Sequence, residues 1–252
     1  MTDALPIPSD NRIVVLPLGA HEQHGPHLPF ETDTIIAAGV VERVKRRLPP
    51  EFDVEFLPVE EVGYSIEHSD VAGTKTLSYG EAIERWTGFG EQAARRGTRK
   101  FIMLNAHGGN SPLMTVAATE LRVRLHMLAV ATSWTRFGYP EGLVPPDERA
   151  YGIHGGFIET SAMLALRPDL VRMERAGNFR SRQEDLVREM THLRAYGPHA
   201  FGWMMHDLSP DGVAGNAALA NAQAGEAMLD HAAAGFIELL RDVARFDIAS
   251  LS

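Results

Sequence analysis

Residues 13–33 have the sequence IVVLPLGAHEQHGPHLPFETD, in which an apolar run passes directly into a loop of carboxylates and imidazoles. The apolar run at residues 13–16 is typical of a buried strand. The loop that follows carries Glu22, His24 and Asp33, with further histidines and glutamates beside them. Open α/β proteins place their chemistry just beyond the carboxyl ends of the strands, and these side chain types bind metals. The stretch therefore predicts a metal site at the edge of a sheet.

The chain has 252 residues, which fits one large domain covering residues 1–252. Its formal net charge of −9 and the lack of a basic stripe argue against nucleic acid as a partner. Because there is no cysteine, disulfides, thiolate nucleophiles and cysteine-bound zinc are excluded, and His, Asp and Glu must hold any metal. Residues 1–6 do not resemble a signal peptide, and no apolar run is long enough to cross a membrane. We therefore expect a cytoplasmic protein with no membrane partner.

Strand, loop and helix alternate along the chain. We expect strands at about 13–18, 54–59, 100–105 and 126–133, and helices at about 33–48, 80–96, 112–125, 157–166 and 216–245. Thr32 or Asp33 is expected to cap the first helix. The order predicts an α/β fold, a mainly parallel sheet flanked by helices on both faces. Since right-handed crossovers bring the ends of parallel strands to one edge, the loops after Leu18 and Asn105 should meet, with residues 175–210 as a covering segment.

Five side chains from separate segments form the predicted metal centre: Glu22, His24, Asp33, His107 and Glu159. One ion with five protein ligands would leave little room for water and substrate. Two divalent ions that share Asp33 would each have three protein ligands, with a bridging hydroxide as the fourth. Three carboxylates and one hydroxide balance the charge of two such ions, so the count favours a two-metal hydrolase. Each residue alone also fits an ordinary role in a loop or at a helix end, and only the combination is specific.

At these residues the chain resembles the creatininase (creatinine amidohydrolase) family. The matching pieces are residues 18–29 with Thr32 and Asp33, residues 105–110 and residues 154–161, with weaker matches at 63–68 and 212–215. The resemblance implies a metal-dependent amidohydrolase with an α/β/α layered fold, assembled as a homo-oligomer that is often a hexamer. It also implies zinc, manganese or iron as the metal. It assigns metal binding to four residues, with Asp33 as the bridge: Glu22, His24, Asp33 and His107.

Two departures from the family pattern concern the substrate. Creatininase itself has a Tyr-Glu pair where this chain has Gly108 and Gly109, and that glutamate binds metal. Glu159 is therefore expected to supply the missing ligand here. Creatininase also has a Trp-Asp pair, which helps to hold creatinine, where this chain has Ala150 and Tyr151. Creatinine is accordingly disfavoured, and another small-molecule amide is expected.

The predicted reaction is hydrolysis of a C–N amide bond, first of all in a small cyclic amide, by the hydroxide that bridges the two metal ions. His154 is the candidate that protonates the leaving nitrogen, and Glu159 has a catalytic as well as a metal-binding role. The candidates for substrate contact are His68, Gly108, Gly109 and Tyr151. Alternatives within the family are a formamide deformylase, disfavoured because the motif loops carry few basic residues, and a short-peptide hydrolase. An alternative of another class is a non-catalytic binding protein whose loops are ordered by metal.

Overall fold

A four-stranded parallel sheet forms the centre of the molecule, which a computed structural model describes for residues 11–251. The strand order is β2 (Val54–Phe56), β1 (Ile13–Leu18), β3 (Lys100–Asn105) and β4 (Leu128–Ser133). Leu18 pairs with Asn105, and Asn105 pairs with Ser133, so three strands end at the same level. The predicted α/β fold with its mainly parallel sheet is confirmed. The expectation about residues 1–6 lies outside the described residues.

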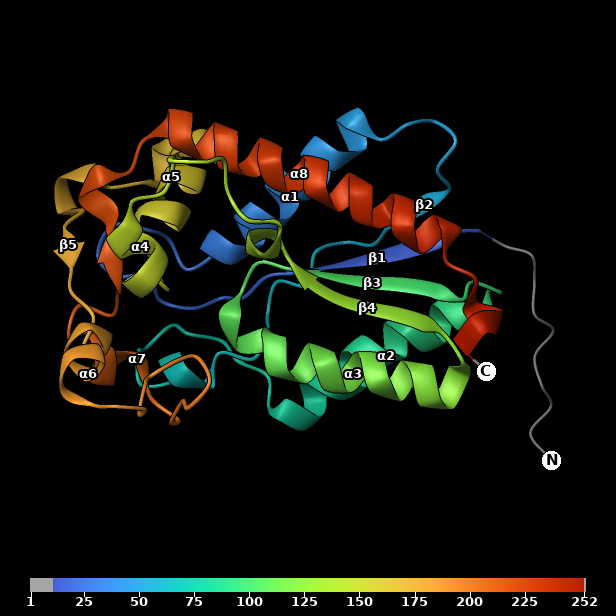
Figure 1. Cartoon of the computed structure of the whole chain (residues 1–252), viewed down its shortest axis with the longest axis horizontal. Coiled ribbons are helices and arrows are strands. Elements are labelled where there is room, and N and C mark those ends of the chain that lie inside the picture. Colours follow the sequence, from blue (N-terminus) through green and yellow to red (C-terminus); the bar gives the residue numbers. More distant parts are fainter. Residues whose placement is uncertain (1–10, 252) are drawn as a thin grey trace.

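Helices cover both faces of this sheet (Figure 1). One face carries α1 (Thr32–Arg47), α5 (Phe157–Leu166) and α8 (Ala222–Arg245). The other carries α2 (Tyr79–Arg95) and α3 (Ser111–Leu125). Because successive side chains of a strand point to opposite faces, Val15 and Ile102 belong to the first apolar core, whereas Val14 and Phe101 belong to the second. Burial of each such side chain stabilises the fold by roughly 1.5–3 kcal/mol.

The less regular part of the chain gathers beyond the carboxyl ends of the strands, at the opposite end of the molecule from the C-terminus (Figure 1). Its elements are a 3₁₀ helix (Ile66–His68), α4 (Pro146–Tyr151), β5 (Asn178–Phe179), α6 (Gln183–Glu189), α7 (Met205–Leu208) and β6 (Gly215–Asn216). β5 and β6 form a separate antiparallel pair. A small apolar cluster that includes Leu186, Met205 and Leu208 holds this part together.

The start of α1 differs from the prediction. Neither Thr32 nor Asp33 caps the helix, because both lie inside its first turn. Glu31 takes the cap position without a side-chain hydrogen bond, and the Thr32 hydroxyl donates instead to the Pro29 carbonyl oxygen at 2.7 Å. The Asp33 carboxylate does not cap the helix, and both of its oxygens lack a hydrogen-bond partner among the described residues.

The start of α8 also differs from the prediction. It begins at Ala222 rather than near residue 216, because β6 and a 3₁₀ turn (Ala217–Leu219) come first. Asn221 caps the helix and accepts a hydrogen bond from the Ala224 N–H at 2.9 Å. The helix packs against α1 and α5 of its own chain, and assembly into an oligomer stays a prediction. Within residues 11–251, no helix has the length and apolar character needed to span a membrane.

Candidate metal centre

The loops that follow β1 and β3 meet beyond the sheet edge and are joined by two buried asparagines. Asn105 Oδ1 accepts a hydrogen bond from the His107 N–H at 3.1 Å. The Asn110 amide donates to Asn105 Oδ1 and to the Gly19 carbonyl oxygen, both at 3.0 Å. Asn110 Oδ1 accepts from the Tyr64 N–H at 2.9 Å. Three loops are therefore fixed to one another, and His107 is held over the end of β1.

All five side chains predicted as metal ligands converge at this point. Glu22 Oε1 and Asp33 Oδ2 lie 3.2 and 3.4 Å from the same atom, His107 Nδ1. Asp33 Oδ1 lies 3.4 Å from His24 Nε2, and that nitrogen is 3.7 Å from Glu159 Oε2. The two oxygens of Asp33 thus face two separate ligand sets, Glu22–Asp33–His107 and His24–Asp33–Glu159. In each set the ligand atoms lie within 4.8 Å of one another.

The free atoms of the cluster fit divalent cations. Both carboxylate oxygens of Glu22 and of Asp33, together with His24 Nε2, are buried without a hydrogen-bond partner in the described part of the chain. Buried polar atoms are nearly always satisfied, so these require a partner of another kind. Carboxylate oxygen and imidazole nitrogen are ligands for zinc, manganese and iron. The donor set therefore suits the metals that the resemblance to the creatininase family implied.

The second nitrogen of each ligand histidine is held by a backbone carbonyl. His24 Nδ1 lies 3.0 Å from the Glu22 carbonyl oxygen, and His107 Nε2 lies 2.9 Å from that of Tyr64. An N–H that donates to a carbonyl leaves the lone pair on the other ring nitrogen. These bonds favour the tautomers in which His24 Nε2 and His107 Nδ1 can bind an ion.

The pKa values in the cluster also indicate that its buried carboxylates require positive charge nearby. Burial would lower the pKa of His24, but the neighbouring Asp33 carboxylate raises it to about 9, and Glu22 likewise raises the pKa of His107. Burial would raise the pKa of both carboxyls, yet His107 lowers that of Glu22 and His24 lowers that of Asp33. Protons on the two imidazoles thus balance the carboxylates, and metal binding must displace these protons.

Two further histidines lie beside Glu22. His154 Nδ1 and His68 Nε2 lie 3.5 and 3.4 Å from Glu22 Oε1. His154 Nε2 is 2.7 Å from the Gln23 carbonyl oxygen, so the N–H donates there and the lone pair of Nδ1 faces the cluster. Burial lowers the pKa of both rings, that of His68 to about 4. Both histidines are therefore neutral near pH 7.

Glu159 lies in the first turn of α5, and its Oε2 accepts a hydrogen bond from the Gly155 N–H at 2.7 Å. Burial raises the pKa of its carboxyl to about 7, although the nearby His24 opposes this shift. Its side chain is 17% exposed, compared with 1% for Asp33. Glu159 is thus the outermost of the five ligands, at the border between the cluster and the cavity beside it.

A cavity of about 380 Å³ opens beside the cluster. Its polar side chains come from Glu67, His68, His107, His154 and Glu159, and Gly108 and Gly109 line it with backbone. Its apolar lining comes from Pro112, Ile153, Tyr196, Trp203 and Met205. The Trp203 indole donates a hydrogen bond to the Ala195 carbonyl oxygen at 2.7 Å, which fixes the ring. The segment at residues 175–210 therefore supplies an apolar wall to the site.

The sequence profile of the Creatininase family, described as creatinine amidohydrolase, matches residues 2–240. The chain belongs to the creatininase family. It is 36% identical over 180 residues to a mycofactocin precursor peptide peptidase from Mycobacterium tuberculosis (strain CDC 1551 / Oshkosh), a match that covers 68% of this chain and 66% of the relative. It is 30% identical over 183 residues to the creatinine amidohydrolase of Pseudomonas putida, covering 65% of this chain and 67% of the relative. The chain thus spans about two thirds of the length of each.

Solved creatininase structures share the fold. A structure described as creatininase with Mn is 26% identical to this chain and superposes with a TM-score of 0.71, covering 92% of this chain and 91% of the other. A mutant creatininase of Zn-Zn type is also 26% identical, with a TM-score of 0.70, and 92% and 90% of the two chains are covered. This creatininase-family chain thus shares its fold with structures described as manganese and zinc forms of creatininase.

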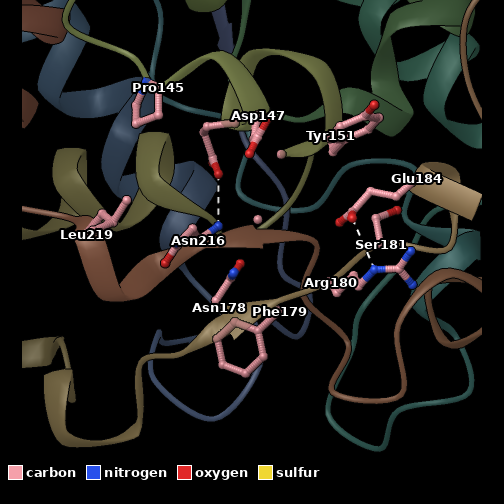
Figure 2. Close-up of a pocket in the computed structure, with 13 residues that line it drawn as sticks. Pro145, Asp147, Tyr151, Asn178, Phe179, Arg180, Ser181, Glu184, Asn216 and Leu219 are labelled. Atoms are coloured by element: carbon pink, nitrogen blue, oxygen red, sulfur yellow. Dashed lines mark hydrogen bonds and ion pairs between the residues drawn. The ribbon is translucent and has the colours of Figure 1, made fainter.

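One predicted substrate contact, Tyr151, lies elsewhere in this creatininase-family chain. It lines a second pocket of about 270 Å³ together with residues of β5 and β6, among them Asn178 and Asn216 (Figure 2). In the same pocket Arg180 pairs with Glu184, with 3.0 Å between Nε and Oε2. His68, Gly108 and Gly109, in contrast, do line the cavity beside the cluster. A substrate role for Tyr151 stays a prediction that has no support from its position.

Sequence reasoning missed several residues of this site. Glu67 lines the cavity beside His107, and Asn110 joins the ligand loops. Tyr196 and Trp203 form part of the apolar wall. Glu67 and Asn110 lie inside the stretches that resemble the family, so attention to every polar residue of those stretches could have found them. The two aromatic residues lie in an irregular segment that gives no comparable signal.

The buried His27 should make the stability of this protein decrease at acidic pH. Its buried Nε2 lies 3.0 Å from the Gly155 carbonyl oxygen and 2.9 Å from Thr160 Oγ1, and burial lowers its pKa to about 4. Because the folded value is below the unfolded value of about 6.5, this histidine contributes stability that is present above pH 6.5 and lost as the pH falls through 4. The free energy of unfolding of the metal-free wild type should fall between pH 6.5 and pH 4. In His27→Gln this fall should be smaller by on the order of 2 kcal/mol.

Urea unfolding at several pH values measures this effect. His126→Asn is the matched control, since His126 is an exposed residue with a left-handed backbone, which asparagine tolerates. If the free energy of unfolding changed with pH in the same way in wild type and His27→Gln, the assignment of the acid sensitivity to His27 would be wrong.

Proposed function

We propose that this chain hydrolyses a C–N amide bond with the help of two divalent metal ions. The supporting observation is the position of Asp33, whose two buried oxygens face different ligand sets and have no hydrogen-bond partner within residues 11–251. Glu22 and His107 would complete one set, and His24 and Glu159 the other. Zinc, manganese and iron all suit these donors.

Such ions polarise the amide carbonyl and acidify a water molecule when bound. The side chains of this protein handle the proton and the substrate. His154 Nδ1, whose ring is fixed by the Gln23 carbonyl, accepts a proton from the attacking water and returns it to the leaving nitrogen. The apolar wall that contains Tyr196 and Trp203 excludes bulk water from the reacting groups. A cavity beside the cluster also argues against the alternative of a non-catalytic metal-ordered protein.

For the substrate, the structure and the relatives favour the amide bond of a short peptide. The apolar wall of the cavity suits an apolar side chain next to the scissile bond, and the relative with 36% identity is a peptide peptidase. The small cyclic amide expected from the sequence is the second candidate, supported by the creatinine amidohydrolase of Pseudomonas putida. A phosphorylated formamide fits less well, because no lysine or arginine is among the described residues that line the cavity.

Metal analysis and a substrate panel test this proposal together. Protein purified without chelator should contain two ions per chain and should hydrolyse one class among short peptides, cyclic amides and formamides. Removal of the metal should abolish turnover, and zinc, manganese or iron should restore it. Glu22→Gln and His107→Ala should lose both metal and activity, whereas the exposed Glu61→Gln should keep both.

Two results would contradict the proposal. One is an absence of bound metal even after supplementation with all three ions. The other is full activity in both ligand variants. Turnover confined to cyclic amides would instead select the second candidate substrate.

A further inference from the structure

Glu67 is a carboxylate beside the metal centre that the two ligand sets do not use. It belongs to the 3₁₀ helix Ile66–His68, and its side chain is 14% exposed and lines the cavity. Its Oε1 lies 3.6 Å from His107 Nε2. The other nitrogen of that ring, Nδ1, faces Glu22 and Asp33. Glu67 therefore lies at the outer side of His107, and one of its ligand atoms is also within 4.8 Å of those of Glu22 and His68.

Gly109 makes room for this arrangement. An added Cβ at position 109 would collide with Glu67 Oε1, with His107 Nε2 and with the Tyr64 carbonyl oxygen. The carbonyl is backbone, and the ring is held by a hydrogen bond to it, so neither can move aside freely. A larger residue at position 109 must therefore push Glu67 away from His107 or turn the imidazole.

A negative charge near the outer nitrogen of His107, Nε2, can stabilise positive charge on the ring. This nitrogen lies 2.9 Å from the Tyr64 carbonyl oxygen, to which its N–H donates, and 3.4 Å from Ser65 Oγ. When Nδ1 binds a cation, positive charge spreads to this N–H. A carboxylate 3.6 Å away is too distant for a hydrogen bond but stabilises that charge electrostatically. Carboxylates next to metal-bound histidines increase the basicity of the ligand and the affinity for the metal.

We propose, on the basis of the function proposed above, that Glu67 is a positioning residue that strengthens metal binding by His107. Gly109 is required for this arrangement, because only glycine leaves the Glu67 carboxylate in its place beside the His107 ring. Glu67 does not bind the ion itself in this arrangement.

Zinc titration of the metal-free full chain tests the inference. Glu67→Gln removes the charge at nearly constant shape, and we expect zinc to bind about 10–100-fold more weakly, with two ions still bound at saturation. Glu67→Asp keeps the charge and should recover part of the lost affinity. Gly109→Ala should weaken binding as well, because it displaces Glu67. Glu61→Gln makes the same change of charge at an exposed position and should bind zinc like wild type.

The outcomes separate this inference from the proposed function. Equal zinc affinity in Glu67→Gln and wild type would overturn the inference and leave the two-metal hydrolase intact. Loss of one ion at saturation would overturn it by making Glu67 a direct ligand. A melting temperature of metal-free Glu67→Gln well below that of Glu61→Gln would overturn it by assigning the effect to folding. A wild-type chain that binds none of zinc, manganese and iron would overturn both proposals.

Discussion

Replacement of Asp33 by asparagine should lower kcat/KM by about 10³-fold or more and leave at most one metal ion per chain. The reason is that Asp33 presents one oxygen to His24 and the other to His107, so both ligand sets depend on it. Asparagine keeps one carbonyl oxygen but replaces the other with an NH₂ group, which is a donor and cannot bind a cation. Metal content by mass spectrometry and turnover on the best substrate of the panel measure the two effects.

The control for this variant is Asp169→Asn, which removes an exposed carboxylate that pairs with Arg167 at the surface. Exposed ion pairs of this kind contribute little to stability, so metal content and activity should stay at the wild-type level. Circular dichroism of both variants establishes that they are folded. Two ions per chain with normal turnover in Asp33→Asn would exclude a bridging role for this residue.

The largest effect on stability is expected from Gly225→Ala. Gly225 lies in α8 against the backbone of α5, and an added Cβ would overlap the Ser161 carbonyl and lie 3.0 Å from the Ala162 nitrogen. A helix backbone cannot move aside as a flexible side chain can, so α8 would have to separate from α5. We expect the free energy of unfolding to fall by about 3 kcal/mol. Because α5 carries Glu159, metal affinity should fall as well.

Gly88→Ala in α2 is the matched control. Apart from its chain neighbours and the adjacent backbone of α2, none of the described residues places an atom within 4 Å of an added Cβ there. Alanine in an open helical position should therefore stabilise the protein by roughly 0.5–1 kcal/mol. Urea unfolding of both variants decides the matter, and equal midpoints for the two would show that the α5–α8 contact tolerates a methyl group.

The sheet and the core of the site could be predicted from the sequence because the signals are local. Apolar runs mark β1 and β3, and the rule for parallel crossovers then brings Leu18 and Asn105 to the same edge. Glu22, His24 and His107 follow these strands directly, and their convergence needs no knowledge of side-chain packing. Their roles as metal ligands, by contrast, stay a proposal that the metal content of the purified protein tests.

Features that depend on distant contacts could not be predicted. Tyr151 is only three residues from His154, but the backbone between them is drawn away by hydrogen bonds from the Ile153 and His154 N–H groups to the Ala214 carbonyl oxygen. The partner in this pairing lies about sixty residues later in the sequence, so no local pattern reveals it. Glu67 differs from Tyr151, because it lies in a stretch that resembles the family and could have been found there, although its contact with His107 links two distant segments.

The contact between α5 and α8 also has a consequence for how the protein is made. α8 follows every proposed ligand in the sequence, yet α5, which carries Glu159, packs against it. During synthesis, Glu22, Asp33 and His107 therefore leave the ribosome well before the helix that supports Glu159. Because α1, which carries Asp33, also packs against α8, both ligand-bearing helices gain their full support only when this last helix has been made.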